Sequence, residues 1–163
     1  MRHMRGRSVI LTGCAVAMIA AAIGADSVKG TVIYKGKTGE HRATIAHAYL
    51  VSGPDSFDPK KIGRVLIFSA QDLGEKLRAC TVMACAARQL SEGFTIGLDT
   101  APFLEFWMTL DNSKVQTSGP ADVKAFTRTT DTPNRLAGTL RFDSFGAKVD
   151  VQFDVTLLKA FTK

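Results

Sequence analysis

The chain lacks the sequence motifs of several common enzyme classes. It has no G-x-S-x-G nucleophile elbow, no glycine-rich phosphate loop and no set of cysteines and histidines at zinc-ligand spacing. Only two histidines, His41 and His47, follow the first 25 residues. These absences disfavour serine-hydrolase, nucleotide-dependent and zinc chemistry. We therefore expect no catalytic residue, no cofactor and no metal ligand.

The excess of positive over negative charge is also small outside the N-terminal segment. The whole chain carries 21 Lys and Arg against 15 Asp and Glu, a formal charge of +6. Without residues 1–24, which hold three arginines and no acid, the charge falls to about +3. The only adjacent basic pair in the remainder is Lys60-Lys61, and no basic stripe interleaved with aromatics is present. We therefore expect no nucleic-acid partner.

What the chain does have is an N-terminal segment typical of an export signal. Basic residues precede an uncharged apolar run, 8–23, which ends in small residues before Asp26. This order matches a secretory signal peptide. We expect residues 1–24 to be cleaved and residues 25–163 to form one domain in the periplasm or outside the cell.

Two alternatives to a cleaved leader stay open. The apolar run approaches the length of a membrane-spanning helix. Separately, Leu11-Thr12-Gly13-Cys14 is similar to a lipobox, in which the cysteine receives a lipid anchor. The similarity lies in the middle of the apolar run and not at its end, which favours cleavage. A membrane association is expected only if Cys14 is lipidated.

Two cysteines follow the leader, Cys80 and Cys85. In an oxidising compartment, a pair this close in sequence predicts a disulfide. Positions i and i+5 of a continuous helix diverge by about 140°, so the bridge requires a helix break or a tight turn near residues 82–84. Free thiols, and redox or metal chemistry, are the alternatives.

Alternation of apolar and polar residues dominates the chain after the leader and is typical of half-buried strands. The clearest alternation runs from Val149 to Leu157. With residues 136–142 and the connection 144–147 it predicts an antiparallel hairpin. Further strands are expected at residues 28–34, 43–51, 64–69, 93–99, 103–111 and 123–130.

Residues 73–90 favour a helix instead. Asp72 is typical of an N-cap, with Glu75 three positions later, and helix-forming residues follow. We expect the helix to be interrupted at the cysteines. Turn signals, among them 99–102 and 118–120, separate the strands. About eight strands with one helical insertion predict a mainly β fold, an antiparallel β-sandwich or barrel.

Phe103 and Trp107 form a candidate interaction surface. Along strand 103–111 they lie on the face opposite the apolar set that we expect in the core. Either they pack beneath the 73–90 helix, or they stay exposed and contact a partner. A lipocalin-like cavity for an apolar ligand, lined by Phe106, Met108 and Phe153, is the alternative.

His47 and Tyr49 form a candidate polar site. On an extended strand His47 shares a face with Ile45 and Tyr49, which favours a partly buried, hydrogen-bonded histidine over a ligand or a catalytic base. The acidic pair Asp99 and Glu105 flanks a turn. This position favours solvated surface over a carboxylate dyad.

Several short segments resemble a set of small exported bacterial β-rich proteins of uncharacterised function. These proteins have a Gly-initiated strand, a strand that ends in a His-Ala-Tyr-like triplet, a Phe-Asp-Pro-Lys loop, a buried strand and a closing hairpin. The resemblance implies export and a β architecture and carries over no catalytic residue, and the helical region 80–90 departs from the pattern. The corresponding segments are 30–34, 47–49, 55–61 and 64–69, with 138–142 and 151–155 as the hairpin.

Together these observations predict an exported, non-enzymatic binding protein of the bacterial envelope that recognises a protein or an envelope component. One alternative is a carrier of a small apolar ligand in a β-barrel cavity. The other is a periplasmic hydrolase whose site the sequence patterns do not reveal.

Overall fold

The computed structural model describes residues 26–37, 39–55 and 58–162. The predicted leader, residues 1–24, and its Cys14 lie outside the described residues, so cleavage and lipidation stay predictions. The described part is mainly β, with two short α-helices, and this confirms the fold class that the alternation predicts.

The helices lie between the fourth and fifth strands of the chain. The elements before and including them are β1 (Ser27–Gly36), β2 (Gly39–Ile45), β3 (His47–Pro54), β4 (Ile62–Ser69), α1 (Gly74–Ala79) and α2 (Met83–Arg88). The elements after them are β5 (Gly93–Gly97), β6 (Phe103–Leu110), β7 (Val115–Asp122), the 3-10 helix η1 (Val123–Ala125), β8 (Phe126–Thr132), β9 (Arg135–Ser144) and β10 (Ala147–Ala160).

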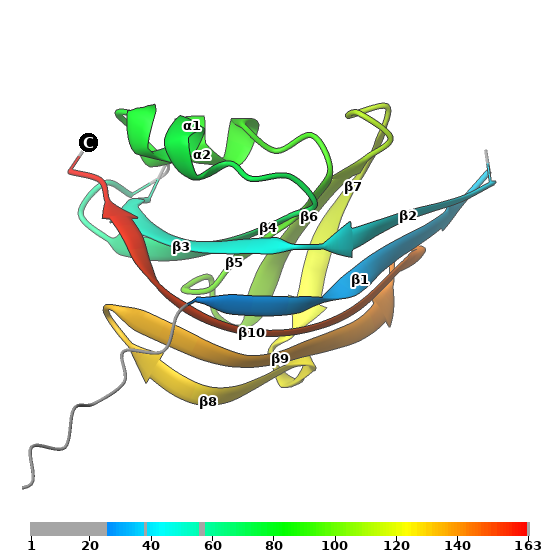
Figure 1. Ribbon diagram of the computed structural model, residues 1–163. Helices are drawn as coiled ribbons and strands as arrows, with labels where there is room; N and C mark the ends of the chain where they lie inside the picture. The colour runs from blue at the N-terminus through cyan, green and yellow to red at the C-terminus, as the bar shows by residue number, and fades with distance from the viewer. Residues whose placement is uncertain (1–25, 38, 56–57, 163) are drawn as a thin grey trace, which may run out of the picture.

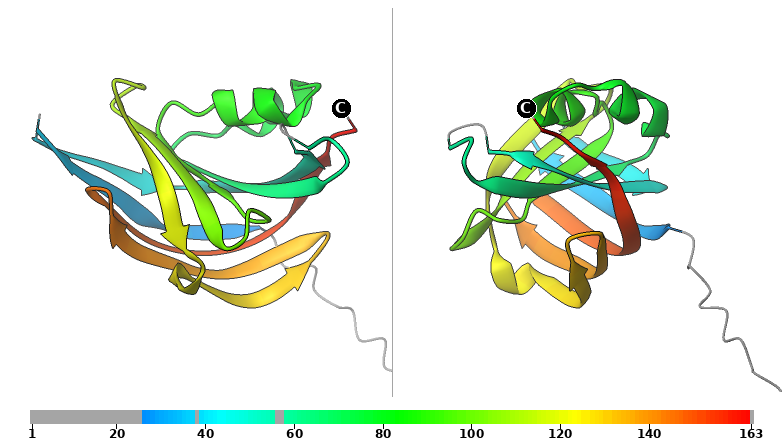
Figure 2. Two further views of the ribbon diagram at one scale, coloured as in Figure 1. Left: turned by 180° about the vertical axis from the view of Figure 1, so that it is seen from behind. Right: turned by 90° about the vertical axis from the view of Figure 1, so that its left-hand side faces the viewer.

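The strands form one curled sheet that makes a half-barrel (Figures 1 and 2). The order is β2-β1-β10-β3-β4-β5-β6-β7, and β9 and β8 extend the sheet from the other side of β10. The sheet has two arms: one contains β1, β2, β8 and β9, and the other contains β3 to β7. β10 belongs to both arms, because residues 147–154 pair with β1 while residues 157–160 pair with β3. The β3–β10 pair is parallel, whereas the other strand pairs of the described residues are antiparallel, as the prediction of an antiparallel fold has it. Long chain connections permit the parallel pair, since parallel neighbours cannot be joined by a tight turn.

The closing hairpin is confirmed as an antiparallel pair. β9 and β10 pair along their length, from Ala147 opposite Ser144 to Thr156 opposite Arg135. The two-residue turn between them is Phe145-Gly146, with φ values of 54° and 73°. Two positive φ angles are typical of the hairpin turns that match strand twist, and glycine adopts such angles without strain.

The strand predicted at 43–51 is two strands, because Ala46 interrupts it. β2 pairs with β1 in one arm of the sheet, whereas β3 pairs with β4 in the other. Ile45 packs in the central core, and after the break the core positions are the residues that alternate with His47 and Tyr49. The break shifts the alternation by one residue. The predicted shared face of Ile45 and His47 is therefore wrong, and His47 lies with Tyr49 on the outer face.

β7 occupies residues 118–120, where the sequence predicts a turn. Pro120 lies within this strand, opposite Glu105 of β6. Proline is tolerated in an edge strand because its missing N–H removes no ladder hydrogen bond on the open side, and β7 pairs with β6 alone in the described sheet. The strand predicted at 123–130 begins later, at Phe126, because η1 precedes it.

Two hydrophobic cores lie on opposite sides of strands β3 to β6. The central core fills the concave side of the curled sheet and contains stacked rings, with Phe68 and Phe94 4.7 Å apart between centroids. The smaller core lies between the outer face of the sheet and the helices, where Leu77 of α1 packs with Ile67 of β4. The helices therefore cover the outer face of this arm, as Figure 1 shows.

The helical insertion predicted at 73–90 is present as two helices, α1 and α2, with residues 80–82 between them. The N-cap of α1 is Leu73, so the prediction of Asp72 as N-cap is wrong by one residue. Asp72 Oδ1 instead accepts a hydrogen bond from Gly74 N at 2.8 Å, a local Asx-type turn that precedes the helix. Neither helix of the described residues has the length and apolar character that crossing a bilayer requires.

Candidate functional site

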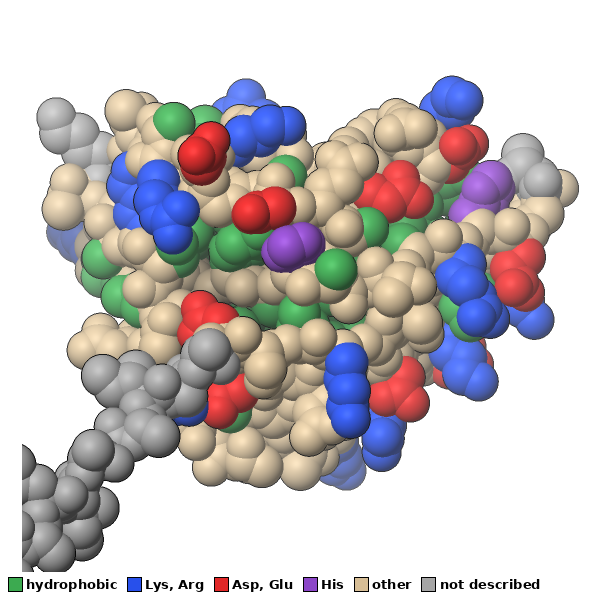
Figure 3. Space-filling model, viewed as in Figure 1, with side chains coloured by type: hydrophobic (Ala, Val, Ile, Leu, Met, Phe, Trp, Pro, Cys, Tyr) green, Lys and Arg blue, Asp and Glu red, His purple; other side chains and the backbone are tan. Residues whose placement is uncertain are grey.

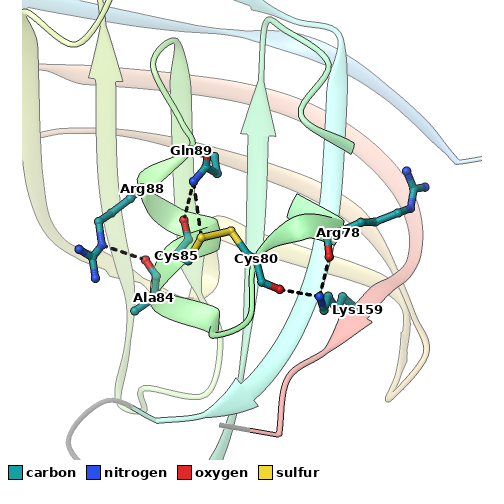
Figure 4. Close-up of a disulfide and its surroundings, with 7 residues drawn as sticks. All are labelled: Arg78, Cys80, Ala84, Cys85, Arg88, Gln89 and Lys159. Atoms are coloured by element: carbon teal, nitrogen blue, oxygen red, sulfur yellow. Dashed lines mark hydrogen bonds between the residues drawn. A yellow bond between two sulfur atoms is a disulfide. The ribbon is translucent and has the colours of Figure 1, made fainter. Parts of the chain in front are cut away.

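A disulfide joins the end of α1 to α2, and the predicted Cys80–Cys85 pair is confirmed with 5.7 Å between the Cα atoms (Figure 4). Lys159 of β10 donates hydrogen bonds to the carbonyl oxygens of Arg78 and Cys80 at 2.6 and 2.5 Å. Gln89 Nε2 donates to the carbonyl oxygen of Cys85 at 3.4 Å. The disulfide holds α1 and α2 together, and Lys159 fixes the end of α1 to the sheet.

A groove of about 540 Å³ lies between α2 and β6 on the outer face of the sheet. Ala84 and Ala87 of α2 form one side, and Phe103 and Trp107 of β6 form the other. Residues of β4 and β5, among them Val65, form the floor. The structure therefore brings the two predicted aromatic residues to one concave site and adds a helical wall to it.

Two glycines form part of the floor of this groove. Gly97 of β5 lies opposite Val65 on one side and Glu105 on the other. A Cβ at Gly97 would stand 3.1 Å from Glu105 Cβ and 3.3 Å from Glu105 Oε2, so the Glu105 side chain lies over this glycine. Gly63 of β4 has no atom within 4 Å of the place where a Cβ would stand. The floor is therefore open at Gly63, whereas the Glu105 side chain covers Gly97.

Phe103 and Trp107 differ in exposure. Phe103 is 43% exposed, whereas Trp107 is half-buried and packs against the smaller core beneath the helices. Trp107 therefore packs under the helical layer, as one alternative predicts, and still borders the groove, whereas contact of Phe103 with a partner stays a prediction. Trp107 is the single tryptophan of the chain, so its fluorescence reports on this site.

Arg64 forms an ion-pair network beside the groove. Its Nε and Nη2 donate to the two carboxylate oxygens of Asp99 at 3.1 Å each, and its Nη1 donates to Asp131 Oδ1 at 2.6 Å. The hydrogen bonds that Arg64 donates to Asp99 and Asp131 raise the pKa of Arg64, and the hydrogen bond from Arg64 lowers the pKa of Asp131. Since Asp131 lies on β8, the network ties β4 to the other arm of the sheet. The charge of Arg64 is thus compensated within the protein.

Glu105 is the carboxylate of the groove that is available to bind a ligand. Its carboxylate forms no hydrogen bond or ion pair with any residue that the structure describes. Asp99, in contrast, is engaged by Arg64. Asp99 and Glu105 are both exposed, as predicted, and both border the groove. The alternation of β6 does place Glu105 on the face of Phe103 and Trp107, a signal that the sequence offers.

The predicted polar residues His47 and Tyr49 lie in a separate pocket of about 230 Å³ that also includes Asp72. The two rings are stacked, 6.4 Å apart between centroids and 5° between planes. His47 is half-buried, as predicted, but its ring donates and accepts no hydrogen bond among the described residues. Figure 3 shows this face, on which acidic side chains and a histidine border a strip of hydrophobic side chains below the helical layer.

Hydrogen bonds in this pocket anchor the start of α1 to β3. Tyr49 Oη donates to Asp72 Oδ1 at 2.7 Å and accepts a hydrogen bond from Leu73 N at 2.8 Å. Burial and the hydrogen bond to Asp72 raise the pKa of Tyr49 to about 12, and the same hydrogen bond lowers the pKa of Asp72. Tyr49 is therefore a neutral phenol at neutral pH, and its hydroxyl donates a hydrogen bond to the Asp72 carboxylate. This arrangement has a structural role.

The side chains that would line a carrier cavity are packed in the central core. Phe106 and Met108 are fully buried, and the Phe106 ring lies 4.9 Å from that of Phe142 between centroids. Phe153 packs edge-on against Phe68 at 5.1 Å. Since these side chains fill the concave side of the sheet, they give no support to an apolar-ligand carrier.

The fold and the groove together define a β half-barrel with a helix-bordered surface site. Comparisons of the chain with protein-family models, with curated proteins and with solved structures found no match. The resemblance to small exported β-rich proteins stays a prediction, and the function is argued from the groove itself.

Proposed function

We propose that this protein is an exported, non-enzymatic binding protein of the bacterial envelope that docks a partner in the groove between α2 and β6. The observation that carries the proposal is the meeting of Phe103 and Trp107 in one hollow of about 540 Å³. Aromatic side chains in a concave, partly apolar site are typical of interaction surfaces. An exposed phenylalanine beside a tryptophan offers contact area that a partner can bury.

The engagement of the ionisable groups supports binding over catalysis. In the groove, Asp99 is occupied by Arg64. In the smaller pocket, Asp72 accepts hydrogen bonds from Tyr49 and from Gly74 N. A general acid or base must exchange its proton with a substrate, whereas these carboxylates hold parts of the fold together.

Export is supported by the leader-like segment and by the Cys80–Cys85 disulfide, since disulfides persist in oxidising compartments. Intact mass of the protein from its native host tests this directly. We expect the mass of a chain cleaved after residue 22, 24 or 25, lowered by roughly two daltons for the disulfide. An added acyl mass on Cys14 would show that the protein is anchored by a lipid and does not diffuse freely. The mass of an uncleaved, reduced chain would overturn the proposal of export.

Photo-cross-linking in the native host tests the groove as the docking site. A photoreactive amino acid replaces Phe103 in one variant and Val123, an equally exposed apolar residue of η1, in a control. We expect a discrete adduct of higher mass from position 103 and none from position 123. Equal adducts from both positions, or none from position 103, would contradict the proposal.

A further inference from the structure

We propose that the groove receives a basic side chain of a partner protein, flanked by apolar residues, and that its cationic head binds Glu105 between Phe103 and Trp107. The inference rests on the proposed function and specifies the chemistry of the occupant. It follows from three properties of the groove: its uncompensated charge, its aromatic residues and its apolar helical wall.

The charge of the groove is complementary to a cation. Its lining holds three carboxylates, Asp55, Asp99 and Glu105, and one guanidinium, Arg64. Arg64 is bound on two sides by Asp99 and by Asp131, so its charge is not presented to a ligand. Glu105 is left without an ion-pair partner in the part of the chain that the structure describes. Electrostatic complementarity of this kind selects among partners and fixes their register.

The aromatic residues strengthen the preference for a cation. Phe103, Glu105 and Trp107 alternate along β6, and residues two positions apart on a strand are separated by about 7 Å. Glu105 therefore stands between two aromatic residues in the order of β6, and its side chain reaches over Gly97 within the same groove. Aromatic faces attract Lys and Arg head groups within about 6 Å, with tryptophan the strongest.

The apolar wall favours a side chain of a protein over a small inorganic cation. Ala84 and Ala87 of α2 face the groove, and Met83 and Val65 add further apolar surface. Lys and Arg carry three or four methylene groups that cover such surface while the head group reaches a charge. Apolar neighbours of the basic residue fill what remains of the hollow.

Peptide selection on the exported protein tests this chemistry. A phage library of random dodecapeptides is selected on the wild-type protein and counter-selected on Gly63→Leu. Because a Cβ at Gly63 would meet no atom within 4 Å, we expect the leucine side chain to extend into the groove and to reduce its free volume. Binding of the enriched peptides is then measured through the fluorescence of Trp107.

We expect the enriched peptides to share a Lys or Arg next to apolar residues. Their affinity should fall about tenfold or more in Glu105→Gln, since a charge-assisted contact is lost. Glu75→Gln is the matched control, because Glu75 is an exposed carboxylate of α1 outside the groove, and it should leave affinity unchanged.

The outcomes separate the two proposals. Neutral or acidic peptides that bind the wild type but not Gly63→Leu, and bind Glu105→Gln equally well, would overturn the cationic occupant while leaving the docking groove in place. If counter-selection on Gly63→Leu removes every peptide that binds the wild type, or if the enriched peptides bind without a change in Trp107 fluorescence, both proposals would be overturned.

Discussion

Gly97 lies directly opposite Glu105 in the β5–β6 pair, and Glu105 Oε2 stands 3.3 Å from the position that a Cβ on Gly97 would occupy. A side chain at position 97 would compete with the glutamate for this space. The missing side chain thus lets Glu105 lie across the sheet, above the floor of the groove. One glycine therefore shapes the hollow and directs its free carboxylate.

Removal of the disulfide is expected to loosen the helical wall of the groove. In the double variant Cys80→Ser/Cys85→Ser, the free energy of unfolding should fall by about 2 kcal/mol, the value for a short closed loop. Urea unfolding measures the loss. Trp107 packs against the core that contains the disulfide, so its emission should move toward that of solvent-exposed tryptophan. An unchanged unfolding midpoint would contradict this role of the bridge.

The hydroxyl of Thr109 is expected to lower the free energy of unfolding of the protein. Thr109 is fully buried, and its Oγ1 is the buried side-chain polar atom without a hydrogen-bond partner in the described part of the chain. Thr109→Val removes the desolvated hydroxyl and should raise the free energy of unfolding by about 1 kcal/mol. The same change at exposed Thr127 should alter it by less than about 0.5 kcal/mol. A destabilised Thr109→Val would indicate that the hydroxyl has a partner.

The Arg64–Asp131 ion pair is expected to stabilise the fold in a pH-dependent way. The folded-state pKa of Asp131 is lowered by Arg64. Its contribution is therefore present above the unfolded pKa, about 3.9, and is lost as the pH falls through the folded value. Asp131→Asn should be less stable than the wild type by about 1 kcal/mol at neutral pH, and the difference should vanish in acid.

A matched control separates this network from a simple surface pair. Asp150 pairs with Arg141 at 2.9 Å, but both side chains are largely exposed. Asp150→Asn should therefore have little effect on urea unfolding at either pH. Equal and pH-independent losses in the two variants would contradict the stabilising role of Asp131.

Tyr49 gives the opposite pH dependence, at the alkaline end. Its folded-state pKa is raised to about 12 by burial and by the hydrogen bond to Asp72. Its contribution is therefore complete below the unfolded pKa, about 10, and is lost as the pH rises toward the folded value. The midpoint of thermal unfolding of the wild type should therefore fall over that pH range. Tyr49→Phe should be less stable at neutral pH and should lose less stability over that range. Parallel pH profiles for the two proteins would contradict the account.

The hairpin and the disulfide could be predicted because their signals are local. The alternation from Val149 to Leu157 and the turn before it lie within one stretch of chain, and Cys80 and Cys85 are five residues apart. The break at Ala46 could not be predicted, because it depends on the chain passing from one arm of the sheet to the other. From the sequence alone Pro120 indicates a turn. Proline is tolerated in an edge strand, but no sequence signal shows that β7 is one.

The groove was predictable only in part for the same reason. Alternation alone puts Phe103 and Trp107 on one face of β6. The floor at Gly63 and Gly97 depends on the register of three strands, and the helical wall depends on how α2 docks. Such relationships join residues that are distant in sequence. Composition and periodicity do not encode them.

The most direct test of the docking groove combines its blocked form with cross-linking in the native host. Gly63→Leu is introduced into the variant that carries the photoreactive residue at position 103. The substitution should leave the unfolding midpoint unchanged, because a side chain at Gly63 meets open space. We predict that the adduct from position 103 disappears in the blocked protein. An adduct of undiminished yield from a folded Gly63→Leu protein would contradict the account.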